Sequence, residues 1–171
     1  ALSADNPRLA RESLSDVPAD KAAPLLLWAQ LLDNSKTTLT NLAADPTAPV
    51  EPEALVAGFD HLARADSQAA LGLLPKLLSR PDMTPIMQER LQRTAALGAA
   101  YGRDAAAVGA FDQLPDTSID NDVREWRVRA ALWAGDFPKA LAWIEQMPPN
   151  LSTQPKWRYW RARAVEATSG G

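Results

Sequence analysis

Residues 122–149 read DVREWRVRAALWAGDFPKALAWIEQMPP, and this stretch predicts two amphipathic helices joined by a very short turn. Asp122 can cap the first helix, with Glu125 at the position that completes a capping box. Gly135 is expected to end that helix in the left-handed conformation, and Asp136 to cap the second helix, which stops at the Pro-Pro pair. The stretch therefore predicts a helical hairpin.

A helix end followed at once by a capping Asp recurs along the chain. Ala65-Asp66 and Gly102-Arg103-Asp104 precede Gly135-Asp136, so the three Asp residues are 38 and 32 residues apart. The hexapeptide WRVRAA at 126–131 is echoed by WRARAV at 160–165. Such a period, about 30 to 40 residues with two helices per unit, is typical of an α-solenoid.

The remaining helix-capping and helix-breaking residues also predict helices. Period-2 alternation of apolar and polar residues is rare, and Asn-Gly or Asp-Gly hairpin turns are absent from the sequence. We expect helices opening at Asn6-Pro7, from Asp20 to Leu32, from Ser35 or Thr37 to Ala44, from Glu53 to Ala65, from Asp66 through Leu78, from Thr84-Pro85 to Gly102, from Asp104 to Pro115, and from Pro155 to Thr168. Pro75 should kink or split the helix that follows Asp66. Residues 45–52 form the longest expected linker.

These observations predict an all-α fold, a right-handed α-superhelix (solenoid) of tetratricopeptide-like helical hairpins. We expect a single domain over residues 1–171, with less regular helices in 1–50 and stacked hairpins in 51–171. The apolar stripes expected to face the core are Trp126, Ala130 and Trp133 in one helix, Phe137, Ala140, Leu141 and Ile144 in the next, and Trp157, Trp160, Ala164 and Val165 in the last.

Composition excludes several classes of function. The net charge of -3 argues against a nucleic-acid surface, which needs an excess of Lys and Arg. Cysteine is absent, which removes disulfides, thiolate nucleophiles and Cys-based zinc sites. No apolar run approaches the roughly 20 residues that a membrane-spanning helix requires. No signal peptide is visible at the first residues.

Few residues of the sequence are candidates for a role in catalysis. His61, the single histidine, lies in an amphipathic helix and is expected to be structural, and one His without Cys makes a zinc site improbable. The carboxylates at the expected caps are explained by capping, and no pair of acids stands out. Gly-rich phosphate loops and a Gly-x-Ser-x-Gly motif are absent. We therefore expect no catalytic residue, no cofactor and no metal.

Tryptophan and arginine crowd the C-terminal part, where residues 126–171 hold five of the six tryptophans. The tryptophans could line a sugar-binding groove, but their helical spacing favours packing between hairpins. The arginines between them are expected to cover apolar surface, with contact to an anionic polymer as the alternative. The candidate contact residues for a glycan or a partner are Trp157, Arg158, Tyr159, Trp160 and Arg161.

Three segments, RAALWAGDF at 129–137, WIEQMP at 143–148 and KWRYWRARAVEA at 156–167, resemble the superhelical, non-catalytic (U-type) domain of soluble lytic murein transglycosylases. The WRYW sequence at 157–160, with Met147-Pro148 before it, is the most specific part. The close resemblance covers about 45 residues, and the rest matches only in helical rhythm.

This resemblance implies a periplasmic parent enzyme that cleaves the bond between N-acetylmuramic acid and N-acetylglucosamine and leaves 1,6-anhydro ends. The family's active glutamate lies in a lysozyme-like domain that follows the superhelix, and no glutamate here matches its motif. The implied partners are peptidoglycan glycan strands, the rest of the superhelix and a C-terminal catalytic domain. The alternatives are a tetratricopeptide-like adaptor that binds a protein, and a small free-standing enzyme.

Overall fold

The computed structural model describes residues 17–170, which contain ten α-helices, one 3-10 turn and no strand. The helices are α2 (Ala19–Asp33), α3 (Ser35–Ala44), α4 (Pro52–Ala65), α5 (Ser67–Leu78), α6 (Pro85–Tyr101), α7 (Ala107–Asp112), α8 (Asn121–Trp133), α9 (Phe137–Glu145), α10 (Pro149–Ser152) and α11 (Pro155–Ser169), with the turn η2 (Asp116–Ser118) before α8. The helix expected at Asn6-Pro7 lies outside the described residues.

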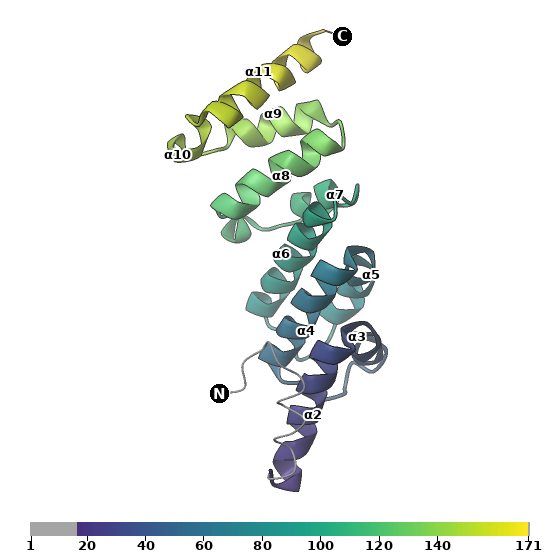
Figure 1. The fold of residues 1–171 in the computed structure, drawn as a ribbon. Coiled ribbons are helices and arrows are strands. Elements are labelled where there is room, and N and C mark those ends of the chain that lie inside the picture. Colours follow the sequence, from purple (N-terminus) through teal and green to yellow (C-terminus); the bar gives the residue numbers. More distant parts are fainter. Residues whose placement is uncertain (1–16, 171) are drawn as a thin grey trace.

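The helices stack into an elongated body that rises from α2 at one end to α11 at the other (Figure 1). Consecutive helices pair as α2 with α3, α4 with α5, α6 with α7 and α8 with α9, and α4 also packs on α2 and α6. This arrangement confirms the all-α stack of helical hairpins. The right-handed superhelical twist stays a prediction.

The core consists of two clusters of buried side chains that follow one another along the stack. Phe59 and Leu91 lie in the cluster formed by α2 to α6, and Phe111 and Trp157 in the cluster formed by α6 to α11. Leu71 packs against both, so the apolar interior is continuous from one cluster to the next. None of the described helices is long and apolar enough to cross a membrane.

The helix joints follow the sequence closely. The carboxylate of Asp66 accepts the N–H of Ala69 at 3.0 Å, and the carboxylate of Asp136 accepts the N–H of Lys139 at 3.0 Å. Gly135 has a φ of 73°, and the N–H of Asp136 donates to the carbonyl of Ala131 at 2.9 Å. This is the Schellman arrangement, which satisfies the last carbonyls of α8.

Two of the predicted caps were wrong. The residue that caps α8 is Asp120, whose carboxylate accepts the N–H of Val123 at 2.9 Å, because the chain enters the helix before Asp122. Glu125 therefore forms ion pairs instead of a capping box. Asp104 accepts the N–H of Ala106 at 2.9 Å and fixes the turn before α7, which begins only at Ala107.

Pro75 does not split α5, which runs unbroken from Ser67 to Leu78. The side chain lies exposed on the solvent side of the helix. A proline in a helix removes one backbone hydrogen bond, and packing of the apolar face of α5 on α3, α4 and α6 outweighs that loss.

The buried face of α8 differs from the predicted one. Trp133 is 45% exposed, and Val123, Val128 and Ala131 are buried in its place. Because α8 packs against α6, α7 and α9 together, its core-facing side is rotated away from the stripe that periodicity alone suggests. The other residues of the expected apolar stripes fall into three groups. Those buried as expected are Ala130, Ala140, Ile144, Trp157 and Ala164. Phe137 and Leu141 are half-buried, and Trp160 and Val165 are exposed.

Residues 45–51 form an ordered loop because a buried arginine binds its backbone. The guanidinium of Arg80 donates to the carbonyls of Leu42 at 2.8 Å, Asp45 at 3.2 Å and Ala48 at 2.6 Å. It also pairs with the carboxylate of Asp82 at 2.8 Å. The loop between the α3 and α4 helices is thereby tied to the end of α5.

Helices α4 and α6 approach each other closely at Gly98. A Cβ atom on Gly98 would lie 2.5 Å from the carbonyl oxygen of Ala63, which is a backbone atom and cannot rotate away. Replacing Gly98 with Ala is therefore expected to destabilise the fold by about 1–3 kcal/mol, because the helices must separate. Urea unfolding followed by circular dichroism measures the change.

Gly72 is the matched control for this substitution, since it also lies inside a helix but has open space around its Cβ position. Gly72→Ala should stabilise the protein by about 0.5–1 kcal/mol through helix propensity. Equal effects of the two substitutions would contradict the role given to the close approach.

Arg80→Ala should lower the free energy of unfolding by at least about 2 kcal/mol, because three backbone carbonyls lose their donor. Arg64→Ala removes an exposed pair with Asp60 and should cost less than about 0.5 kcal/mol. Thermal unfolding of the two variants side by side makes the comparison. A loss at Arg80 no larger than that at Arg64 would show that the loop holds without the arginine.

Candidate functional site

The predicted contact residues on α11 do not share one environment. Trp157 is only 2% exposed and belongs to the core, and its indole Nε1 is buried without a hydrogen-bond partner. It packs inward because α11 lies along α9 and buries the face that carries Trp157 and Ala164. Trp157 is therefore no surface contact residue, contrary to the sequence-based set.

The other four candidates are exposed. Tyr159 and Trp160 are 57% and 37% exposed, and their rings meet edge to face with centroids 5.2 Å apart. Arg158 is exposed, and Arg161 forms an ion pair with Glu145 at 3.3 Å. We call these four residues, Arg158 to Arg161, the α11 surface.

The start of α11 is fixed to α8 by charges and aromatic rings. Glu125 binds Lys156 at 2.7 Å and Arg129 at 3.0 Å. The guanidinium of Arg129 lies over the rings of Trp126 and Trp157, 4.8 and 5.3 Å from their centroids. Contacts of this kind attract a cation to the negative ring face, so the cluster fixes the position of the α11 surface relative to α8.

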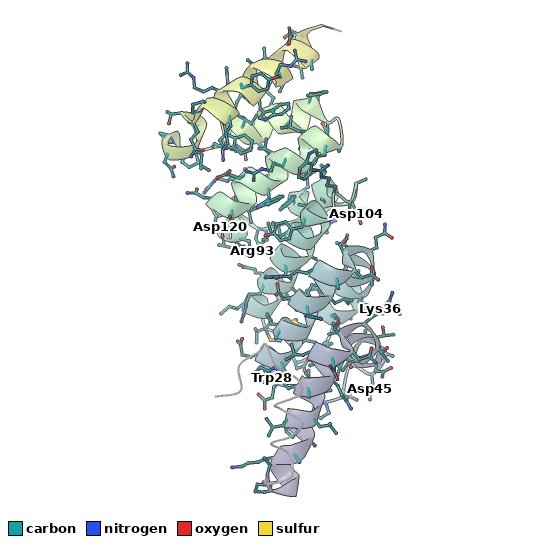
Figure 2. All side chains as sticks on the ribbon, in the orientation of Figure 1. Trp28, Lys36, Asp45, Arg93, Asp104 and Asp120 are labelled. Carbon is teal, nitrogen blue, oxygen red and sulfur yellow. The ribbon has the colours of Figure 1, made fainter. Side chains whose placement is uncertain are left out.

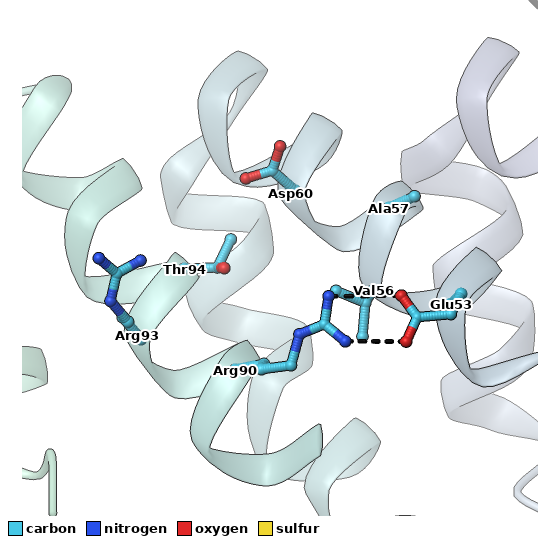
Figure 3. Close-up of a pocket in the computed structure, with 7 residues that line it drawn as sticks. All are labelled: Glu53, Val56, Ala57, Asp60, Arg90, Arg93 and Thr94. Carbon is cyan, nitrogen blue, oxygen red and sulfur yellow. Dashed lines mark hydrogen bonds and ion pairs between the residues drawn. The ribbon is translucent and has the colours of Figure 1, made fainter. Parts of the chain in front are cut away.

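A groove between α4 and α6 is lined by charged residues that already have partners (Figure 3). Glu53 binds Arg90 at 2.9 Å on one side of it, and Asp60 pairs with Arg64 at 3.2 Å. Arg93 turns toward α8 and binds Asp120 at 2.7 Å (Figure 2). Because these charges are satisfied within the protein, the groove presents no unpaired charged group to a ligand.

The described acids are arranged for structure. Hydrogen bonds from Thr47, Lys36 and Arg80 hold the pKa values of Asp45, Asp66 and Asp82, respectively, below their usual range. A general acid needs a raised pKa instead. Within residues 17–170 no three His, Cys, Asp or Glu side chains gather where they could hold a metal ion, and His61 is exposed on α4.

A second exposed aromatic group lies where α6, its following turn and α8 meet. Tyr101 and Trp133 are 47% and 45% exposed, and Trp126 lies between them, with ring centroids 4.7 Å from Tyr101 and 6.2 Å from Trp133. Trp126 and Trp133 were expected to face the core from α8. One sequence feature pointed to this exposed aromatic group: Arg103 falls in the tight joint between Gly102 and Asp104.

Comparison with known proteins gives the class to which this stack of hairpins is related. No protein-family model matches the chain. Over 164 residues, 95% of the chain, it is 25% identical to the soluble lytic murein transglycosylase of Escherichia coli strain K12, and equally to that of strain O157:H7. The X-ray structure of an inactive mutant of the lytic transglycosylase Slt from Pseudomonas aeruginosa superposes with a TM-score of 0.78 and 25% identity over 94% of the chain.

These matches show that the stack of helical hairpins is similar in sequence and in fold to part of the lytic transglycosylases. In particular, the chain is similar to soluble lytic murein transglycosylases, in agreement with the resemblance carried by the WRYW and Met-Pro motifs. It spans about a quarter of the length of these relatives, 25% of the Escherichia coli proteins and 26% of the Pseudomonas aeruginosa chain.

The ion pairs at the α11 and α5 joints predict a stability that falls in acid. Burial raises the pKa of Glu125, but the hydrogen bond and charge of Lys156 and the charge of Arg129 outweigh it and hold the pKa below 4.5. A lowered folded pKa gives stability that is complete above the unfolded value and is lost as the pH falls through the folded one.

The midpoint of thermal unfolding should therefore stay level between about pH 8 and 5 and drop below about pH 4.5. Glu125→Gln should lower the midpoint at neutral pH and make the acid drop smaller. A midpoint that rises on acidification, or an unchanged drop in the variant, would contradict this account of Glu125.

Proposed function

We propose that this chain is a non-catalytic superhelical scaffold within a peptidoglycan lytic transglycosylase that works in the periplasm. The parent enzyme would cleave the bond between N-acetylmuramic acid and N-acetylglucosamine and leave 1,6-anhydro ends. The observation that carries the proposal is the match to such enzymes over almost the whole chain, in sequence and in fold. The catalytic glutamate would lie in another domain of the parent.

The scaffold would hold glycan strands through the α11 surface. Tyr159 and Trp160 present aromatic rings on which the apolar face of a pyranose can pack. Arg158 stands beside them without an ion-pair partner in the described part of the chain, so it can receive a carboxylate of peptidoglycan. Rings and cation together favour an anionic glycan over a neutral one.

Incubation of the purified chain with murein sacculi tests the non-catalytic assignment. We expect no release of anhydro-muropeptides, measured by liquid chromatography and mass spectrometry, because Asp45, Asp66, Asp82 and Glu125 have lowered pKa values, whereas a general acid needs a raised pKa. Release of anhydro-muropeptides by this chain alone would overturn the assignment.

Pull-down with sacculi tests the binding role separately. The double variant Tyr159→Ala, Trp160→Ala should lose most of the binding, about tenfold or more, because the stacking surface is removed. Ile86→Ala is the matched control, since Ile86 is an exposed apolar residue on α6, away from α11. Retention of binding by the double variant would remove the α11 surface from the proposal, and capture of peptides with no affinity for sacculi would favour the tetratricopeptide-like adaptor.

A further inference from the structure

A small hollow lies between the turn that follows α6 and the end of α8. Its volume is about 70 Å³. The residues that line it are Ala100, Arg103, Asp104, Ala105, Ala130, Trp133 and Ala134. Four of the seven are alanines, so the hollow has an apolar floor with one cation, one acid and one indole ring at its edge.

Arg103 offers a guanidinium group that the protein does not use for hydrogen bonding. Its central carbon lies 4.7 Å from the centroid of the Trp133 ring, so the planar group is held against an aromatic surface. Its backbone φ of 53° is in the left-handed region that non-glycine residues seldom adopt. No carboxylate or carbonyl among residues 17–170 accepts a hydrogen bond from this side chain, in contrast to Arg80, Arg90 and Arg93. A planar fork held in this way is suited to bind a carboxylate with two parallel hydrogen bonds.

Asp104, the next residue, supplies a hydrogen-bond acceptor. Its Oδ1 accepts the N–H of Ala106, but its Oδ2 is buried and has no hydrogen-bond partner. A buried acceptor without a donor is costly, so the Asp104 carboxylate would gain by turning toward a ligand N–H at the hollow. The hollow therefore suits a ligand with a carboxylate at one end and an N–H donor nearby.

The volume of the hollow limits which group of the ligand can lie between its carboxylate and its N–H donor. About 70 Å³ is roughly twice the ~30 Å³ that one water molecule occupies in the liquid. This space accepts a methyl group and a carboxylate. The alanine side chains around it offer contacts to a methyl group and no polar partner.

We propose that the hollow binds the last residue of an alanine-ended peptide. The carboxylate would pair with Arg103, the methyl group would lie among the alanines, and the amide N–H would point to Oδ2 of Asp104. The inference rests on the proposed function for its ligand source, since the peptide stems of peptidoglycan provide such ends. The site is distinct from the α11 surface, which would hold the glycan.

The test uses N-acetyl-D-alanyl-D-alanine as the probe, titrated into the intact chain while the indole N–H signal of Trp133 is followed by NMR. We expect a saturable shift of this signal. The C-terminal amide of the same peptide should bind at least about tenfold more weakly, because it has lost the charge that the guanidinium pairs with.

Arg103→Asn removes the guanidinium, and Asn tolerates the left-handed conformation, so the turn should keep its shape. It should weaken binding of the acid about tenfold or more, whereas Arg64→Asn, the same change at an exposed arginine of α4, should leave binding unchanged. Circular dichroism checks that both variants are folded.

Three results would overturn the proposal: equal binding of the acid and the amide, no loss in Arg103→Asn, or an equal loss in Arg64→Asn. Tighter binding of the L-alanyl peptide than of the D-alanyl peptide would overturn peptidoglycan as the source of the ligand. If the peptide does not bind, pull-down of sacculi by the α11 surface is unaffected, and only the inference about the hollow is wrong. If the wild-type chain does not bind sacculi, the proposed function itself is wrong.

Discussion

The close approach of α4 and α6 at Ala63 and Gly98 is the contact on which the stack depends. With no side chain at Gly98, the two backbones come within a distance that even a methyl group would prevent. Gly58 plays a related part between α2 and α4, where an added Cβ would lie 2.8 Å from the side chain of Leu31. These contacts bring helices of successive hairpins together, and the apolar core then continues along the stack.

Electrostatic interactions connect neighbouring hairpins. Lys36 of α3 binds Asp66 before α5, Arg93 of α6 binds Asp120 before α8, and Lys156 of α11 binds Glu125 of α8. Each pair joins elements that are about 27 to 31 residues apart, close to one repeat. The acids are thus committed to the fold, which explains why the shifted carboxyl pKa values are lowered.

Binding in such a structure depends on what the stack leaves uncovered. The α11 surface offers rings and an unpaired arginine, and the hollow at Arg103 offers a fork and a small apolar space. The two lie on different elements of the stack, the α11 surface on α11 and the hollow between the turn after α6 and the end of α8. An enclosed site for a small substrate is not needed for this role.

The sequence by itself determined the local features, and these were predicted well. Most helix bounds from Ala19 onward, the joints at Asp66 and Gly135-Asp136, and the resemblance to lytic transglycosylases follow from residues close together in the chain, because caps, turns and motifs are local. The start of α7, the cap of α8 and the short helix α10 were not predicted. Only the tertiary structure decided which parts of the expected apolar stripes stay uncovered. Trp133 and Trp160 are exposed, and Arg103 meets Trp133, because these positions depend on contacts between helices that are separated in sequence, and the period of one helix carries no information about its neighbours.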